Sequence, residues 1–209
     1  MKLLICGHSY AADLERFCVN QFEVDSVVFE LSYVHRRGAT YDTLLRDEGF
    51  WNDIDLIVPD YILVILGGNS IKCHVSNLEI YKVAREFYST LKGKHPDATI
   101  ISAQIELRFY KLVNRWNCPS GDDYLTRRVA VNNFIKRLTK LDNKHHILQV
   151  GGDCRLDNRE LYRDEIHLND SGLLRYYNYI RRTLKYILRV NIPRNCFDRK
   201  RVCVAHRLT

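Results

Sequence analysis

Hydrophobic residues in this chain form short runs that alternate with longer segments of helical periodicity. Five runs have the length and the apolar, often β-branched or aromatic content of buried strands, at residues 3–6, 26–34, 61–66, 99–103 and 146–150. Helices are predicted between and after them, at residues 10–20, from about 41, after 76, at 123–141 and from 170 to about 188. Strands that alternate with helices favour βα units and a parallel sheet.

Two of the predicted helices have clear local sequence signals. Ser76 and Glu79 form a capping-box pattern, and the apolar positions that follow are spaced four, three and four residues apart. The last helix, capped by Asp170 or Ser171, has an apolar face whose residues step by four, three, four and three. No internal repeat or linker interrupts residues 1–190. The pattern therefore predicts one doubly wound, three-layer α/β/α domain, followed by a basic tail at residues 191–209.

Most of the net charge lies at the C-terminal end. The chain has 209 residues and a formal net charge of +7, and residues 189–209 hold six Arg or Lys against one Asp, which is +5 of that total. Such a tail can bind nucleic acid or an anionic membrane surface, although a solvated terminus is the simpler interpretation. Hydrophobic residues make up 46% of the chain, as in globular proteins, and no apolar run approaches the ~20 residues of a transmembrane segment.

The cysteines and the first residues bear on the cellular compartment. Seven cysteines, an odd number without a Cys-x-x-Cys pair, indicate reduced thiols rather than a disulfide framework. The apolar run at residues 3–6 is shorter than the hydrophobic region of a signal peptide. We therefore expect a cytoplasmic protein. Cys196, Cys203 and His206 match no strong metal-site spacing, so no metal is expected.

Glycines and polar residues directly follow the predicted strands. An open parallel sheet binds its ligands in this region, beyond the carboxyl ends of the strands. A Gly-His-Ser segment follows the first strand, Gly38 follows the second, and a Gly-Gly-Asn-Ser segment follows the third. Asp164 and His167 follow the fifth. A hydroxyl, an imidazole, a carboxylate and amide donors on one edge are the groups of acyl-transfer chemistry.

These residues suggest a serine nucleophile with a general base. Ser9 would attack the substrate, His167 would remove its proton, and Asp164 would orient the imidazole. The backbone N–H groups of Ser9 and Gly38 and the side-chain amide of Asn69 would stabilise the oxyanion. Each residue also has a structural explanation, as a helix cap, a turn residue or a surface pair. Their joint position after successive strands favours the catalytic interpretation.

The same segments resemble the SGNH or GDSL-type hydrolases. Four blocks carry the resemblance, in the order found in that family: Gly7-His8-Ser9-Tyr10, Arg37-Gly38-Ala39-Thr40, Gly67-Gly68-Asn69-Ser70, and Asp164 to His167 followed by Leu168-Asn169-Asp170-Ser171-Gly172. The resemblance covers residues 2–188. It implies a flavodoxin-like sheet of five parallel strands, the roles given above for Ser9, Gly38, Asn69, Asp164 and His167, and no metal or organic cofactor.

Two residues depart from the family pattern. His8 stands where the usual residue beside the nucleophile is Asp, and Ser70 stands where Asp follows the oxyanion Asn. We expect the replaced groups to hold loops, so the departures affect geometry and rate more than the chemistry. A Gly-His-Ser start with a basic tail also resembles the SGNH domains of some animal retroelements, which would favour nucleic-acid binding by the tail.

The main expectation is a serine esterase that cleaves a small carboxylic ester through an acyl-enzyme. The alternative is a weakly active or inactive binding module on the same fold, with the tail contacting nucleic acid or an anionic membrane. Thiol catalysis by Cys6 or Cys154 is a weaker alternative, because Cys6 lies inside a predicted strand. The sequence does not specify the acyl or alcohol group. Residues 105–121, after the fourth strand, are candidates for a lid or specificity wall.

Overall fold

The computed structural model describes residues 1–17, 21–24, 27–106, 108, 121–148, 156 and 158–191. At its centre is a six-stranded sheet with the order β2-β3-β1-β4-β5-β6. The strands are β1 (Lys2–Gly7), β2 (Gln21–Val24), β3 (Val27–His35), β4 (Tyr61–Ile65), β5 (Thr99–Ala103) and β6 (His145–Leu148). β1 pairs in parallel with β3 and β4, β4 with β5, and β5 with β6. The predicted sheet of five parallel strands is confirmed.

The sixth strand, β2, was not predicted. It pairs antiparallel with β3, with Phe22 opposite Phe29 and Val24 opposite Val27. Four residues are too few to establish an alternating pattern in the sequence, and the pairing with β3 decides the conformation. The preceding helix α1 (Ser9–Phe17) is correspondingly shorter than the predicted helix at residues 10–20, whose last three residues lie outside the described part of the chain.

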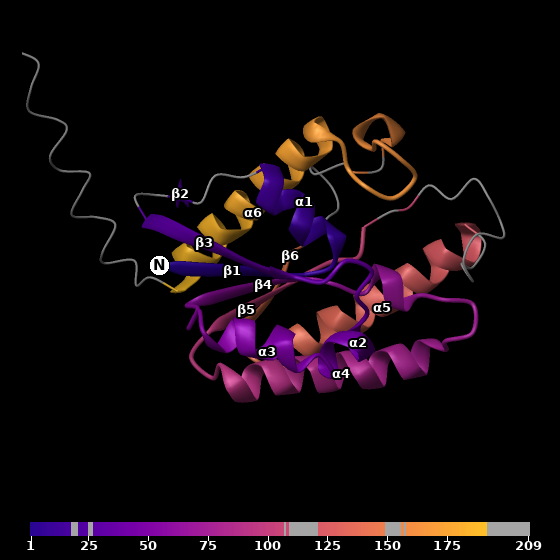
Figure 1. Cartoon of the computed structure of the whole chain (residues 1–209), viewed down its shortest axis with the longest axis horizontal. Coiled ribbons are helices and arrows are strands. Elements are labelled where there is room, and N and C mark those ends of the chain that lie inside the picture. Colours follow the sequence, from indigo (N-terminus) through magenta and orange to yellow (C-terminus); the bar gives the residue numbers. More distant parts are fainter. Residues whose placement is uncertain are drawn as a thin grey trace, which may run out of the picture.

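Helices cover both faces of the sheet (Figure 1). α1 and α6 (Asp170–Asn191) lie on one face, and α2 (Tyr41–Leu45), α3 (Glu48–Asp55), α4 (Asn77–Lys94) and α5 (Gly121–Thr139) lie on the other. Side chains alternate between the faces along each strand. Leu3 and Ile5 of β1 therefore join the core under α1 and α6, while Leu4 and Cys6 join the core under the other helices. The predicted three-layer α/β/α architecture follows from this alternation.

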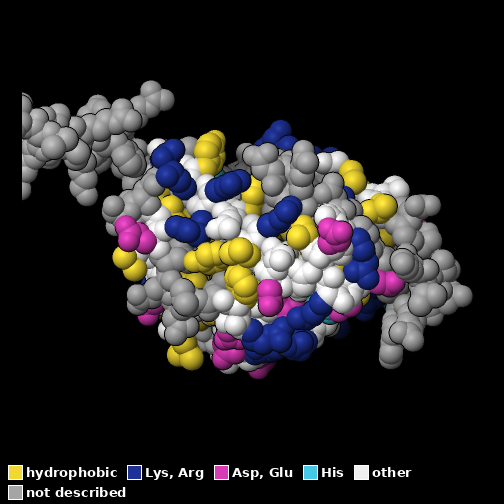
Figure 2. All heavy atoms as spheres, turned by 90° about the horizontal axis from the view of Figure 1, so that it is seen from above, with side chains coloured by type: hydrophobic (Ala, Val, Ile, Leu, Met, Phe, Trp, Pro, Cys, Tyr) yellow, Lys and Arg dark blue, Asp and Glu magenta, His cyan; other side chains and the backbone are white. Residues whose placement is uncertain are grey.

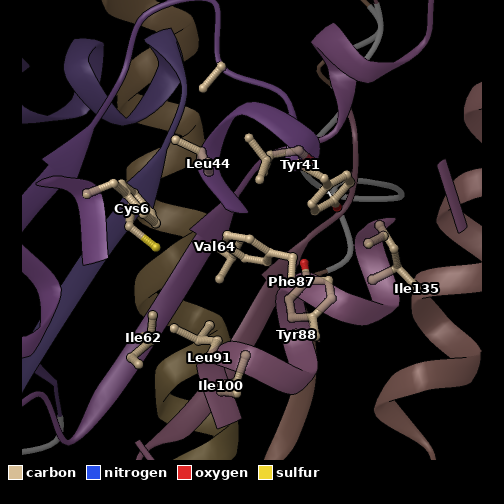
Figure 3. Close-up of a cluster of buried hydrophobic side chains, with 14 of the residues drawn as sticks. Cys6, Tyr41, Leu44, Ile62, Val64, Phe87, Tyr88, Leu91, Ile100 and Ile135 are labelled. Atoms are coloured by element: carbon tan, nitrogen blue, oxygen red, sulfur yellow. Dashed lines mark hydrogen bonds between the residues drawn. The ribbon is translucent and has the colours of Figure 1, made fainter. Parts of the chain in front are cut away.

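The core on the α4 side buries the thiol of Cys6. Figure 3 shows this cluster, in which Phe87 and Leu91 of α4 lie beside Ile62 and Val64 of β4. Burial in this apolar surrounding raises the pKa of Cys6 to about 12. A thiol held protonated and out of contact with solvent is not a nucleophile, which argues against thiol catalysis by Cys6. Cys154 lies outside the described residues.

Several predicted boundaries shift. The helix expected from about residue 41 is two helices, because Asp47 caps a new one by accepting a hydrogen bond from Phe50 N–H at 2.8 Å. The capping box of Ser76 and Glu79 is present at the start of α4. β6 begins one residue before the predicted strand, and residues 149–150 lie outside the described part. Of the helices described, none is long and apolar enough to cross a membrane.

Candidate active site

The central strand β1 ends in a sharp turn that only glycine can form. Gly7 has a φ of +141°, and a Cβ at this position would lie 1.9 Å from the carbonyl oxygen of Ile65. The next residue, His8, donates its N–H to the same oxygen at 3.1 Å. The chain therefore turns directly from β1 into α1, which begins at Ser9. This turn places Ser9 at the carboxyl edge of the sheet and at the N-terminus of a helix.

Ser9, His167 and Asp164 form one hydrogen-bonded chain. The distance from Ser9 Oγ to His167 Nε2 is 3.1 Å, and the distance from His167 Nδ1 to Asp164 Oδ2 is 2.8 Å. The structure thus brings Ser9 to a pair of residues, Asp164 and His167, that lie more than 150 positions later in the sequence. The His167 side chain is 25% exposed, so solvent and substrate can reach the ring.

The environment of Asp164 favours its ionised form. Partial burial opposes ionisation, but Asp164 Oδ1 accepts hydrogen bonds from the backbone N–H groups of Ile166 and His167, each at 2.6 Å. Together with the imidazole of His167, these donors lower the pKa of Asp164 below its usual value. An ionised Asp164 holds the proton of the histidine on Nδ1, which leaves Nε2 free to accept the Ser9 proton.

The loop that carries Asp164 and His167 is attached to α1. Tyr10 donates its hydroxyl to the carbonyl oxygen of Ile166, and Arg163 pairs with Asp13 at 3.0 Å. Only 1% of the Asp13 side chain is exposed, and Asp13 also pairs with Arg16. Both anchors come from the first two turns of the helix that begins at Ser9. The helix that begins at Ser9 and the loop that carries Asp164 and His167 are therefore held together by direct contacts.

The end of the fourth block has a structural role. Asn169 accepts a hydrogen bond from Gly172 N–H at 3.0 Å, so Asn169 caps α6, and not the predicted Asp170 or Ser171. Its side-chain amide also donates to the carbonyl oxygen of Glu160 at 2.6 Å. A Cβ on Gly172 would lie 2.3 Å from the carbonyl oxygen of Leu161, so only glycine allows α6 to approach this segment.

Gly38 and Asn69 follow β3 and β4, the two strands that flank β1. Gly38 adopts a φ of +73°. Asn69 lies in the short helix η1 (Gly68–Ser70) and donates its side-chain amide to the carbonyl oxygen of Ala39 at 3.2 Å, which joins the two loops. Ser70 accepts the N–H of Tyr41 at 3.3 Å and forms a second link between them. The predicted oxyanion residues thus lie on adjacent, connected loops.

His8 is buried and electrically neutral. Its side chain lies within the protein, with 1% of the residue exposed, and its Nδ1 accepts a hydrogen bond from Tyr10 N–H at 3.4 Å. Burial, together with the charge of Arg108 and the proximity of His167, lowers the pKa of His8 to about 3. His8 therefore caps α1 as an uncharged acceptor. A family-type Asp could accept the same N–H, which is consistent with a loop-holding role.

Two residues near the site were not predicted, Glu106 and Arg108. Glu106 is 5% exposed, and its burial raises its pKa to about 7, against the opposing effects of nearby donors and cations. Arg108 donates to Asn69 Oδ1 at 2.8 Å. Both residues follow β5 at the same edge of the sheet as Ser9. This position after a strand is the one feature of the sequence that could have indicated them. The proposed lid at 105–121 lies mostly outside the described residues.

A second serine–histidine pair lies elsewhere in the sheet. Ser102 Oγ is 2.7 Å from His145 Nε2, but Ser102 has no exposed surface. Burial lowers the pKa of His145 to about 4, so this histidine is also neutral. No substrate can reach the Ser102 hydroxyl, and the pair is a buried structural hydrogen bond.

Comparison with known proteins identifies the fold. No model of a known protein family matches the chain, and no curated protein matches it. Among solved structures, a protein assigned as an acylhydrolase from Bacteroides fragilis superposes with a TM-score of 0.68 and 16% identity, covering 90% of this chain and 88% of that one. The chain has an SGNH hydrolase-like fold.

Other proteins with this fold are similar at the same level. A member of the lipolytic G-D-S-L family from Veillonella parvula has a TM-score of 0.62 and 12% identity, over 86% of this chain and 95% of that one. A carbohydrate esterase family 3 protein from Talaromyces cellulolyticus has a TM-score of 0.62 and 13% identity, over 92% and 100%. The predicted SGNH hydrolase-like fold is confirmed, while a retroelement origin stays a prediction.

Proposed function

We propose that the protein is a serine hydrolase that cleaves a carboxylic ester. The observation that carries this proposal is the hydrogen-bonded chain from Ser9 through His167 to Asp164 at the carboxyl edge of the sheet. The SGNH hydrolase-like fold supports it, because proteins described as esterases and acylhydrolases share that fold. The fold alone does not fix the chemistry, so the side-chain geometry is the stronger argument.

In the first half of the proposed reaction, Ser9 Oγ attacks the carbonyl carbon of the ester while His167 Nε2 accepts its proton. The carbonyl oxygen becomes an oxyanion, which the N–H groups of Ser9 and Gly38 and the side-chain amide of Asn69 stabilise. The tetrahedral intermediate then breaks its bond to the alcohol oxygen. His167 returns the proton to that oxygen, which releases the alcohol and leaves the acyl group on Ser9.

In the second half, water replaces the alcohol. His167 Nε2 accepts a proton from the water as its oxygen attacks the acyl carbon, and a second oxyanion forms in the same place. The bond to Ser9 Oγ then breaks, and the proton passes from His167 to the serine. The net reaction converts one ester and one water into one acid and one alcohol. Ionised Asp164 stabilises the imidazolium in both halves.

The proposal is tested with a short acyl p-nitrophenyl ester and a fluorophosphonate probe. Wild-type protein should release p-nitrophenolate and become labelled at Ser9. Ser9→Ala and His167→Ala should lose activity to a similar extent, because triad members act as a unit. Ser89→Ala, an exposed serine on α4, is the matched control and should retain full activity. Turnover that survives in Ser9→Ala, or labelling of Ser102 in place of Ser9, would contradict the proposal.

A second candidate function is nucleic-acid binding by α6 and the basic tail that follows it. α6 contains a single acidic residue, Asp170, and five cationic ones: Arg175, Arg181, Arg182, Lys185 and Arg189. Arg181, Arg182 and Lys185 line a hollow of about 420 Å³ next to β2, and the described residues of its wall include no carboxylate. Figure 2 views the molecule from the α1 and α6 side and shows Lys and Arg side chains at several points of this face.

Nucleic acid fits this surface better than a membrane does. A helix that lies in a membrane surface needs an apolar face exposed to lipid. The apolar face of α6, which includes Leu173, Ile180 and Leu184, is buried against the sheet instead. The exposed face carries Arg175, Arg181, Arg182 and Arg189 beside only two large apolar or aromatic side chains, Leu174 and Tyr186. Its cations can bind phosphates without insertion into a membrane.

Fluorescence anisotropy with a single-stranded RNA oligonucleotide tests this second function. The affinity should fall steeply with salt, and it should weaken in Arg181→Gln/Arg182→Gln and on removal of residues 191–209. Arg46→Gln/Lys82→Gln removes the same charge from exposed positions near α2 and α4 and is the control. Equal loss in the control, or binding only to anionic phosphatidylserine vesicles, would contradict nucleic-acid binding by this surface.

A further inference from the structure

The carboxamide of Asn69 is held at both ends. Its nitrogen donates to the carbonyl oxygen of Ala39 at 3.2 Å, and its oxygen accepts a hydrogen bond from the Arg108 guanidinium at 2.8 Å. A guanidinium has only donors, so it can face the oxygen of an amide but not the nitrogen. Arg108 therefore excludes the flipped arrangement of the amide. The nitrogen has two N–H groups, and the bond to Ala39 uses one of them.

The position of Arg108 is built into the fold. A Cβ on Gly68 would lie 2.6 Å from a terminal nitrogen of Arg108, so the glycine leaves the space that the guanidinium occupies. On α5, the ring of Tyr124 lies with its centroid 5.4 Å from the guanidinium carbon of Arg108. Tyr124 is fully buried, and its ring supports the cation. A backbone segment and a buried aromatic ring thus hold Arg108 against Asn69.

We propose that Arg108 is a positioning residue of the oxyanion hole, which orients the Asn69 amide so that its free N–H faces the developing oxyanion. This inference rests on the proposed ester hydrolysis. The family pattern has an Asp directly after this Asn, whereas Ser70 of this chain accepts the N–H of Tyr41. In this chain the Asn69 side chain is held instead by Arg108, which follows β5, whereas Asn69 follows β4.

A cation on the amide oxygen also strengthens the amide as a donor. It draws electron density from the nitrogen toward the oxygen, which makes the remaining N–H more positive. Both effects act on the transition state, in which negative charge develops on the carbonyl oxygen. Before attack, the oxygen of the substrate carbonyl carries only a partial negative charge. Loss of Arg108 should therefore lower kcat and leave KM nearly unchanged.

A double-mutant cycle tests the inference. Asn69→Ala should lower kcat by roughly 10²- to 10³-fold, the usual effect of losing one oxyanion donor. Arg108→Met, which keeps an unbranched side chain between Gly68 and Tyr124, should lower kcat by about 10- to 100-fold through a misoriented donor. The double variant should be no slower than Asn69→Ala alone, because Arg108 acts only through Asn69.

Three further measurements separate positioning from a structural role. Arg108→Lys keeps a positive charge and an N–H donor for Asn69 Oδ1, and it should recover most of the kcat lost in Arg108→Met. A trifluoromethyl ketone, which forms a tetrahedral adduct with serine, should bind more weakly to Arg108→Met, while KM for the ester stays the same. Arg46→Ala removes an exposed arginine that pairs with Asp42 and should leave every value unchanged. Thermal denaturation checks that each variant is folded.

The outcomes distinguish this inference from the proposed function. If wild-type protein neither turns over the ester nor reacts with the fluorophosphonate, the proposed function and the role of Arg108 both fall. If wild-type protein is active but the losses in Asn69→Ala and Arg108→Met multiply in the double variant, only the role of Arg108 falls. A rise in KM without a change in kcat, or no recovery in a folded Arg108→Lys variant, would also overturn it.

Discussion

Replacing His8 by Asn should change how the stability of the protein depends on pH. His8 is 1% exposed, and its pKa is lowered from 6.5 to about 3. In the unfolded chain the imidazole binds a proton near pH 6.5, whereas in the folded protein it does not until about pH 3. Between these values the unfolded state binds the additional proton. Stability is therefore fully present above pH 6.5 and is lost as the pH falls.

The size of the loss follows from the two pKa values of His8. One unit of pKa difference corresponds to about 1.4 kcal/mol, so lowering the pH from 7 to 5 should cost about 2 kcal/mol at His8. Glu106 acts in the opposite direction, because its raised pKa of about 7 lets the folded state bind the additional proton over the same range. His145 adds a loss of the same sign as that of His8. The wild-type curve alone therefore cannot show the His8 contribution.

The comparison with His8→Asn isolates it. Asn can accept the N–H of Tyr10 in place of Nδ1, so the cap of α1 remains, but the variant does not titrate. Its smaller side chain should lower stability at pH 7 by about 1–2 kcal/mol. Urea denaturation at pH 7, 6 and 5 should then show that wild type loses about 2 kcal/mol more than the variant. Parallel curves for the two proteins would refute a neutral, buried His8.

Three other variants test the site and the turn that forms it. Asp164→Asn should lower kcat by roughly 10³- to 10⁴-fold with little change in stability, since its oxygen can still accept the N–H groups of Ile166 and His167; a loss below tenfold would argue against this role for Asp164. Asp13→Asn should lower the free energy of unfolding, measured by urea denaturation, by about 2 kcal/mol. It should also lower kcat, because it releases Arg163 and with it the loop that carries His167. An unchanged kcat would mean that the Asp13–Arg163 ion pair does not hold the site. Gly7→Ala should lower the free energy of unfolding, followed by thermal denaturation, by more than ~3 kcal/mol, because the new Cβ would clash with the carbonyl oxygen of Ile65. Gly93→Ala on α4, where a Cβ meets open space, should be neutral or stabilising. Equal stability of the two variants would contradict the reasoning.

The sequence predicted most of the sheet because its central strands, β1, β4 and β5, are almost entirely buried. β4 is apolar or aromatic at every position and β5 is apolar at three of five, and a run of this length between helical segments has few alternatives to a buried parallel strand. The four-residue β2 has no such pattern, and its conformation depends on pairing with β3. Local capping signals were reliable where two residues cooperate, as in Ser76 and Glu79, and unreliable where several candidates adjoin, as at Asn169.

The candidate site was predictable as a set of residue types and positions. In a parallel sheet the residues that follow successive strands meet at one edge, so Ser9, Gly38, Asn69, Asp164 and His167 could be grouped without coordinates. Glu106 and Arg108 also follow a strand, but their segment has no periodicity or motif that assigns them a task. Their roles depend on the buried surroundings of Glu106 and on the space beside Gly68, which arise only when α5 packs against the sheet.

The sequence alone determined the order of strands and helices and the chemical groups available at the strand ends, because hydrophobic periodicity and short-range capping act between residues close in the chain. The tertiary structure decided which of those groups touch. Hydrogen bonds from Ser9 to His167 and from Arg108 to Asn69 join residues far apart in sequence, at distances that depend on the packing of whole helices. The tertiary structure also decided the charge of His8, since burial by distant segments, and not its neighbours in the chain, sets its pKa.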